Sequence, residues 1–131
     1  MKITFLGHAT LWIEADGKTL LIDPFISGND KASNKINIKE LKPDFILLTH
    51  AHNDHTLDAE PISKNSNAII VSNYEIAMYY EEKGLRVHPM NHGGSWSFDF
   101  GRLKYVNAVH TSSFADGTYG GQTGGFVLSS E

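Results

Sequence analysis

Cysteine is absent from the 131-residue sequence, which excludes a disulfide framework and a metal site built on thiolates. The sequence also lacks any apolar run near the roughly 18 residues that a membrane-spanning helix needs. Residues 1–15 contain Gly7, His8 and Glu14 and no continuous apolar stretch, which argues against a signal peptide. We therefore expect no membrane partner and, by default, a cytoplasmic location.

Positive charge is also scarce. The chain has 11 Lys and Arg residues against 15 Asp and Glu residues, which gives a formal net charge of −4. Proteins that bind nucleic acid over a broad surface are usually basic, so we expect no nucleic-acid partner. Hydrophobic residues make up 40% of the chain, which is typical of a globular protein, and the length fits a single domain over residues 1–131.

Strand and helix signals alternate along the chain. Nine segments have the alternating or continuous apolar pattern of strands: 2–6, 11–15, 19–23, 45–49, 68–71, 86–90, 96–100, 102–109 and 126–129. A short helix is predicted over 59–64 with Asp58 as its N-cap, and a longer one after a capping box of Ser72 and Glu75. The polar stretch 26–41 is predicted to be a long loop. This order predicts an α/β fold with a mixed sheet and flanking helices.

Histidine is the most informative residue type in this sequence. The chain has seven, and three of them fall within residues 50–55, directly after a predicted buried strand. Residues two apart in an extended chain point the same way, so His50 and His52 can reach one metal ion. After the chain turns, Asp54 and His55 face a second position. Imidazole and carboxylate groups suit zinc and similar divalent ions, and this density of ligands favours a metal site over a merely hydrogen-bonded loop.

The order His-x-His-x-Asp-His after a buried strand resembles the signature of the metallo-β-lactamase superfamily. Four flanking segments are similar to metal-dependent hydrolases of that superfamily, in particular the L-ascorbate-6-phosphate lactonase group: ITFLGHAT at 3–10, LIDPF at 21–25, MNHGG at 90–94 and NAVH at 107–110. The resemblance runs from residue 3 to about residue 128. It implies the N-terminal half of a sandwich of two sheets between helical layers.

The resemblance implies a role for each matching position. His50, His52 and His110 would hold a first metal ion, and Asp54 and His55 would belong to a second. The complete site would contain two divalent ions, with Zn²⁺ preferred and Mn²⁺ or Fe²⁺ as alternatives. Asp54 would also act in catalysis, by orienting the attacking water or taking its proton.

Three further positions have less specific signals. Asp23 resembles the motif aspartate at the end of the superfamily's third strand and would accept a hydrogen bond from a ligand loop, although an Asp-Pro turn explains it nearly as well. His8 and His92 could line the pocket or bind an anionic group. The superfamily pattern also needs a bridging aspartate and a last histidine after His110, and neither has a match among the 21 residues that follow.

These features predict a hydrolase in which metal-activated water attacks a lactone, ester or phosphoester-type bond of a small-molecule substrate, with anionic compounds included. Because the resemblance covers only about the first half of the sandwich and the last predicted strand is cut short, we also expect an open sheet edge. Three explanations compete: a fragment, a truncated product, or a second chain that completes the sandwich as a homo-oligomer. A non-catalytic metal-binding half-domain is the first alternative function. A nuclease of the same superfamily is the second, although no cluster of Lys and Arg supports it.

Overall fold

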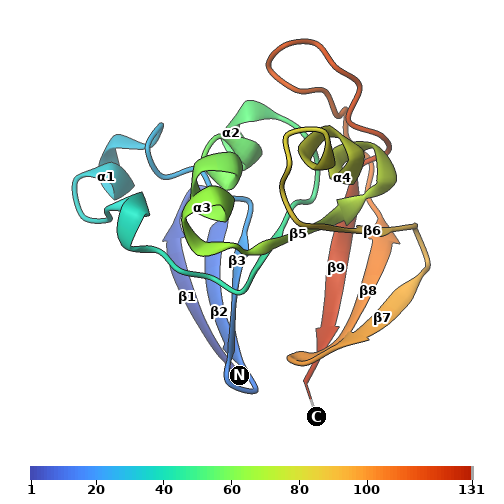
Figure 1. The fold of residues 1–131 in the computed structure, drawn as a ribbon, viewed down its shortest axis with the longest axis horizontal. Helices are drawn as coiled ribbons and strands as arrows, with labels where there is room; N and C mark the ends of the chain where they lie inside the picture. The colour runs from blue at the N-terminus through green and yellow to red at the C-terminus, as the bar shows by residue number, and fades with distance from the viewer. Residues whose placement is uncertain (131) are drawn as a thin grey trace.

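Two sheets and a set of short helices make up the computed structural model, which describes residues 1–130 (Figure 1). The larger sheet contains, in spatial order, β1 (Lys2–Gly7), β2 (Thr10–Ala15), β3 (Lys18–Ile22), β4 (Phe45–Leu47), β5 (Ile69–Asn73) and β6 (Val87–Met90). The smaller sheet contains β7 (Ser95–Phe98), β8 (Gly101–Asn107) and β9 (Gly124–Ser129). Strands β1 to β3 form an antiparallel meander, and β3 to β6 are parallel.

The helices are short and connect the parallel strands. They are α1 (Asp30–Ser33), α2 (Asn53–Thr56), α3 (Ala59–Ser66) and α4 (Tyr74–Glu81), with a single 3₁₀ turn at Ile38–Glu40. Parallel strands need a crossover connection, and α3 and α4 supply it between β4, β5 and β6. Within residues 1–130, none of these helices is long and apolar enough to cross a bilayer. The predicted α/β class with a mixed sheet and flanking helices is confirmed.

The central strand β4 is apolar on both faces, as its continuous hydrophobic run predicts. Ile46 and Leu48 belong to the core that packs against α3 and α4. Phe45 and Leu47 point the other way, into the core that lies between the two sheets. Successive residues of a strand face opposite sides, so a strand covered on both sides is apolar at every position. The segment that leaves β4 therefore starts from a rigid, fully buried position.

The stretch 26–41, predicted to be a loop, contains two helical turns. Asn29 precedes α1, and its side chain accepts a hydrogen bond from the backbone N–H of Lys31. Asn37 precedes the 3₁₀ turn and accepts in the same way from Lys39. The loop prediction was wrong at these two turns because a single asparagine cap suffices to order one turn without any apolar periodicity.

Asp58 precedes α3, as predicted, but its side chain does not cap that helix. One carboxylate oxygen instead accepts the backbone N–H groups of Ile26, at 2.6 Å, and Ser27, at 2.9 Å. The predicted cap was wrong because a buried carboxylate bonds whichever donors lie nearest in space. The result is a tie between α3 and the segment that follows β3.

The N-terminus of α4 lies one residue later than the predicted capping box. Asn73, not Ser72, is the N-cap, and its Oδ1 accepts the backbone N–H of Ile76 at 2.9 Å. The Ser72 hydroxyl donates to the backbone oxygen of Leu48 at 2.7 Å. Ser72 is still part of β5, where its side chain faces the neighbouring strand, so Glu75 has no serine partner for a box.

The helix α2 and the long connection from β8 to β9 lie at the same end of the molecule, opposite the N-terminus and the β2–β3 turn (Figure 1). This connection, residues 108–123, is held over α4. Phe114 stacks on Tyr79 with ring centroids 3.6 Å apart, and the Asn73 amide donates to the backbone oxygens of Gly120 and Gln122. The connection thus lies across the segment that follows β4.

Candidate metal centre

The histidine-rich segment begins where β4 ends. Residues 50–52 leave the strand without helical structure, and α2 then begins at Asn53. The backbone N–H of His55 donates to the oxygen of His52 at 2.9 Å, which closes the first turn of α2. The chain therefore turns after His52, as the spacing predicts, and Asp54 and His55 leave it in a new direction.

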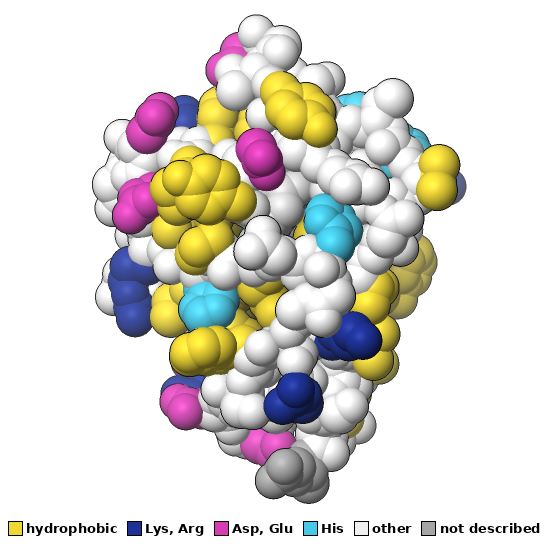
Figure 2. Space-filling view, turned by 90° about the vertical axis from the view of Figure 1, so that its right-hand side faces the viewer, with side chains coloured by type: hydrophobic (Ala, Val, Ile, Leu, Met, Phe, Trp, Pro, Cys, Tyr) yellow, Lys and Arg dark blue, Asp and Glu magenta, His cyan; other side chains and the backbone are white. Residues whose placement is uncertain are grey.

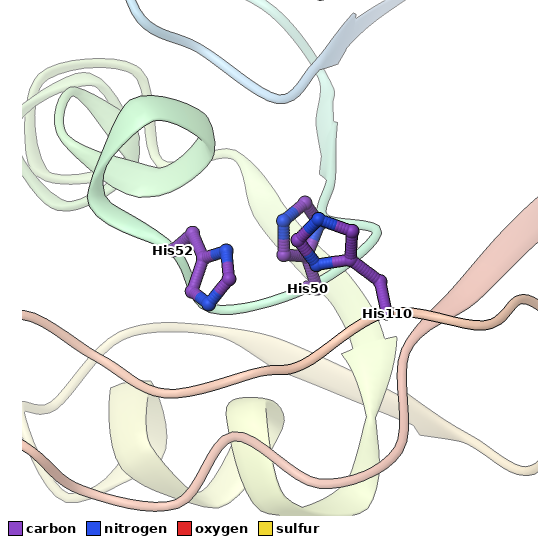
Figure 3. A group of neighbouring side chains, drawn as sticks. All are labelled: His50, His52 and His110. Carbon is purple, nitrogen blue, oxygen red and sulfur yellow. The ribbon is translucent and has the colours of Figure 1, made fainter.

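The structure brings His50, His52 and His110 together, although His110 lies in the 108–123 connection (Figure 3). One ring nitrogen from each lies within 4.8 Å of the others. The ring centroids of His50 lie 4.7 Å from those of both His52 and His110. His50 is buried, His52 is half-buried and His110 is exposed, so this group extends from the core to the surface.

Hydrogen bonds hold the two loops of this group together. The backbone N–H of Ala51 donates to the Ser112 hydroxyl at 3.0 Å, and that hydroxyl donates to the oxygen of Gly120 at 3.1 Å. Gly120 leaves no room for a side chain, since an added Cβ would meet Ala51 Cβ at 2.3 Å. Sequence reasoning missed Ser112, and no sequence signal marks its pairing with a residue 61 positions away.

The hydrogen-bond pattern leaves His50 Nε2 as a free acceptor. The Thr49 hydroxyl donates its single proton to Asp23 Oδ2 at 2.6 Å, so it must accept from His50 Nδ1–H at 2.9 Å. His50 Nε2 is then deprotonated, buried and without a hydrogen-bond partner within residues 1–130. A buried polar atom without a partner is costly, and a bound metal ion would satisfy it. The donor set therefore fits a metal.

A second group lies on the other side of His50. It consists of His8, Asp54 and His55, whose ligand atoms also lie within 4.8 Å of one another. His55 Nδ1 is 2.8 Å from Asp23 Oδ2, an arrangement in which the imidazole donates its Nδ1 proton and presents Nε2 to the site. That Nε2 is 3.7 Å from Asp54 Oδ2. The rings of His50 and His55 are 4.2 Å apart, so the two groups are neighbours.

Asp23 is linked to both groups by hydrogen bonds. Its carboxylate is buried and accepts three hydrogen bonds: from the backbone N–H of Thr49 at 2.8 Å, from the Thr49 hydroxyl and from His55 Nδ1. Its own backbone has a φ of 44°, in the left-handed region. Although Asp23, His50 and His55 are also close enough to share an ion, both Asp23 oxygens already have donors. The hydrogen bonds therefore favour a positioning role.

The environment shifts the proton affinities of the ligands in opposite directions. Burial, followed by the neighbouring imidazole of His55, lowers the pKa of His50 to about 4. The hydrogen bond to Asp23 raises the pKa of His55 above its usual value. Partial burial opposes ionisation of Asp54, yet the hydrogen bond from His8 and the charge of His55 lower its pKa overall. His50 is thus neutral at pH 7, the state in which it can bind a metal.

His92, a predicted pocket residue, belongs to neither group. Its Nε2 lies 3.0 Å from the backbone oxygen of Thr123, and its ring lies 4.6 Å from that of Tyr105. Tyr105 in turn donates its hydroxyl to the backbone oxygen of Thr49 at 3.2 Å. His92 therefore lies behind the segment that carries the ligands, as part of the packing that supports it.

The fold and the clustered ligands define a class of protein. The sequence model of the metallo-beta-lactamase superfamily matches residues 3–128, and the chain belongs to that superfamily. The metallo hydrolase Igni18 from Ignicoccus hospitalis KIN4/I superposes with a TM-score of 0.83 at 30% identity, over 98% of this chain and 55% of that one. An isothiocyanate hydrolase from Delia radicum gut bacteria shares the fold, with a TM-score of 0.71 at 21% identity over 100% of this chain and 59% of its own.

Closer relatives carry a functional description. A UPF0173 metal-dependent hydrolase from Christiangramia forsetii is 64% identical over 131 residues, and one from Flavobacterium johnsoniae is 65% identical over 131 residues. Each match covers 100% of this chain and 58% of the relative. The chain thus spans little more than half the length of these relatives, which are described as metal-dependent hydrolases.

Proposed function

We propose that this chain carries the metal ligands of a hydrolase that cleaves a lactone, ester or phosphoester-type bond. The observation that carries the proposal is His50. Its Nε2 is buried and has no hydrogen-bond partner among the described residues, and the ring centroids of His52, His110 and His55 lie 4.2 to 4.7 Å from that of His50. A buried nitrogen without a partner is costly, and a cation bound among these imidazoles would satisfy it.

Five side chains supply the ligands in this proposal. His50, His52 and His110 hold one divalent ion, and Asp54 and His55 hold a second. Nitrogen and carboxylate donors without thiolate suit Zn²⁺ first, with Mn²⁺ and Fe²⁺ as alternatives. When bound, such ions supply a nucleophilic hydroxide at neutral pH and polarise the oxygen of the bond to be cleaved.

Asp54 is the proposed catalytic residue. Half of its side chain is exposed, at 48%, so it stands where water and substrate enter. Its lowered pKa keeps the carboxylate ionised at neutral pH, so it can hold the attacking water by a hydrogen bond or accept its proton. Asp23 keeps His55 in the tautomer that presents Nε2, and Thr49 does the same for His50.

The substrate in this proposal is a small molecule, with anionic compounds included, and the similarity to the L-ascorbate-6-phosphate lactonase group remains the reason for placing lactones first. Figure 2 supports the exclusion of nucleic acid, because on the face drawn there the Lys and Arg side chains are scattered among other residues. The formal net charge of −4 points the same way. A cytoplasmic location remains part of the proposal.

A second candidate function is a metal-binding half-domain without activity of its own. The exposed apolar side chains of the edge strand β1 favour it, since Ile3 is 59% exposed and Phe5 is 68% exposed. An edge strand with such a face is a site for pairing, and a second copy of the chain or further residues of a longer protein would cover it. This candidate predicts metal binding without hydrolysis.

A hydrolysis assay separates the two candidates. The 131-residue chain, loaded with Zn²⁺ or Mn²⁺, is tested against a lactone, a nitrophenyl ester and single-stranded RNA. We expect hydrolysis of the lactone or the ester that a chelator abolishes, that metal restores, and that D54N lowers by about 100-fold or more. The variant H88N, altered on β6 outside both ligand groups, should match the wild-type chain. Cleavage of RNA alone would contradict the proposal.

A further inference from the structure

The turn between β1 and β2 brings a distant histidine to the second ligand group. His8 Nε2 lies 2.9 Å from Oδ2 of Asp54, 46 residues further along the chain, and the His8 ring lies 5.6 Å from that of His55. We propose that His8 is a third protein ligand of the ion held by Asp54 and His55. This assignment rests on the proposed function, and it gives each of the two groups three ligands: His50, His52 and His110 in the first, and His8, Asp54 and His55 in the second.

The three ligand atoms have the spacing of groups that share an ion. Asp54 Oδ2 is 2.9 Å from His8 Nε2 and 3.7 Å from His55 Nε2, and all three groups converge within 4.8 Å. In a tetrahedral zinc site with bonds of about 2.1 Å, neighbouring ligand atoms are roughly 3.4 Å apart. The two observed separations bracket that value.

The backbone aims His8 at this position. Its φ is 55°, in the left-handed region that residues other than glycine rarely adopt. Hydrogen bonds fix the turn, because the Thr10 hydroxyl donates to the backbone oxygen of Asp23 at 2.8 Å and accepts from Phe25 N–H at 3.0 Å. Strained residues of this kind concentrate at functional sites, where the surroundings impose the conformation.

A simple surface ion pair explains the arrangement less well. The side chains of His8 and Asp54 are 41% and 48% exposed, and pairs with that much exposure contribute little to stability. Such a pair does not need the approach of a third ligand atom. A shared ion accounts for the contact with Asp54 and the position of His55 together.

Titration of the 131-residue chain with Co²⁺, followed by visible absorption, tests the assignment. We expect the wild-type chain to bind two ions. H8N, whose asparagine tolerates the left-handed backbone, should bind one ion normally and the other at least about 100-fold more weakly. Loss of a group that only hydrogen-bonds a ligand already costs 10- to 100-fold in affinity. H88N is the matched control, since His88 packs between Trp96 and Phe98 and should leave both affinities unchanged.

The variant H8G adds a rescue experiment, because glycine suits the turn and leaves space for free imidazole. Added imidazole should restore the absorption of the second ion. Equal binding of that ion by the wild-type chain and H8N would overturn the assignment, as would a wild-type chain that binds one ion. Weaker binding with an unchanged spectrum would assign His8 to positioning Asp54 and would also overturn it. After either H8N result the proposed function stands, whereas a wild-type chain that binds one ion also removes the second ion from it, and failure to bind any Co²⁺ overturns the proposed function itself.

Discussion

The two ligand groups on either side of His50 contrast in how the fold holds them. In the first group, His50 is only 6% exposed, and hydrogen bonds through Ser112 hold two loops together around it. In the second group, Asp54 is half exposed and stands on the four-residue helix α2. Under the proposed function, the first group is a rigid site that retains its ion, and the second is an open site that substrate can reach.

The groups nevertheless share one support. Asp23 receives the Thr49 hydroxyl, which sets the tautomer of His50, and it receives His55 Nδ1 directly. One carboxylate therefore determines which ring nitrogen is left without a hydrogen atom in both groups. Substitutions can therefore weaken metal binding at both groups together, change the pH dependence of stability in opposite directions, or weaken one group alone.

The largest effect is expected for D23N. Asparagine tolerates the φ of 44°, but it has one acceptor oxygen where the carboxylate has two. Its NH2 group must therefore face either the Thr49 backbone N–H, or the Thr49 hydroxyl and His55 Nδ1, so the hydrogen bonds that set the two tautomers are weakened or reversed. We expect both ions to bind about 10- to 100-fold more weakly, as measured by competition with a chromophoric chelator. Normal affinity for both ions in a folded D23N chain would contradict the shared support.

The second prediction concerns the pH dependence of stability in the metal-stripped chain. The pKa of His50 is lowered to about 4 in the folded state, from about 6.5 when unfolded, so protonation favours unfolding. Its contribution is full above about pH 6.5 and is lost as the pH falls towards about 4, by up to about 3 kcal/mol. Urea denaturation should show a smaller loss on acidification in H50Q than in the wild-type chain.

His55 should respond with the opposite sign. The hydrogen bond to Asp23 raises its pKa in the folded state, so its contribution is full below the unfolded pKa and is lost as the pH rises through the raised value. As the pH rises, the free energy of unfolding should therefore fall less in H55Q than in the wild-type chain. If H50Q and H55Q both reduced the loss of stability on the same side of the pH profile, the contrast between the groups would be wrong.

The smallest effect is expected for S112A, which removes the bond between the two loops of the first group. The backbone N–H of Ala51 loses its acceptor, and we expect a loss of about 1–2 kcal/mol in the free energy of unfolding, with weaker binding at the first group alone. Ser113 is its exposed neighbour, so S113A is the matched control and should change neither quantity. A loss confined to the second ion would contradict the division between the groups.

The sequence predicts the fold well where one local pattern decides it. The apolar run at 45–49 identifies a strand buried on both faces, and Asp16-Gly17 identifies the β2–β3 turn. The helix caps were less predictable, because Ser72 and Asn73 are both good caps and only the position of β5 decides between them. Asp58 likewise bonds residues more than 30 positions away in preference to its own helix.

The candidate site, too, was predictable where local spacing decides it and unpredictable where tertiary packing does. The spacing of residues 50–55 places four ligand candidates without any knowledge of the fold, whereas His110 is identified by resemblance and meets them only through the path of residues 108–123. The approach of His8 to Asp54 could not be predicted, since it depends on how the β1–β2 turn packs against a segment 46 residues away. Local spacing defines candidate ligands, and tertiary packing decides which of them share an ion.

The most direct test of the account is the number of metal ions per chain, measured by elemental analysis of the purified 131-residue chain prepared without added metal. The account predicts a value near two, because each of the two groups offers three ligand atoms within 4.8 Å of one another. A value near one would contradict the second site and the assignment of His8. A value near zero, unchanged after incubation with Zn²⁺ and Mn²⁺, would contradict the central claim that these side chains form a metal centre.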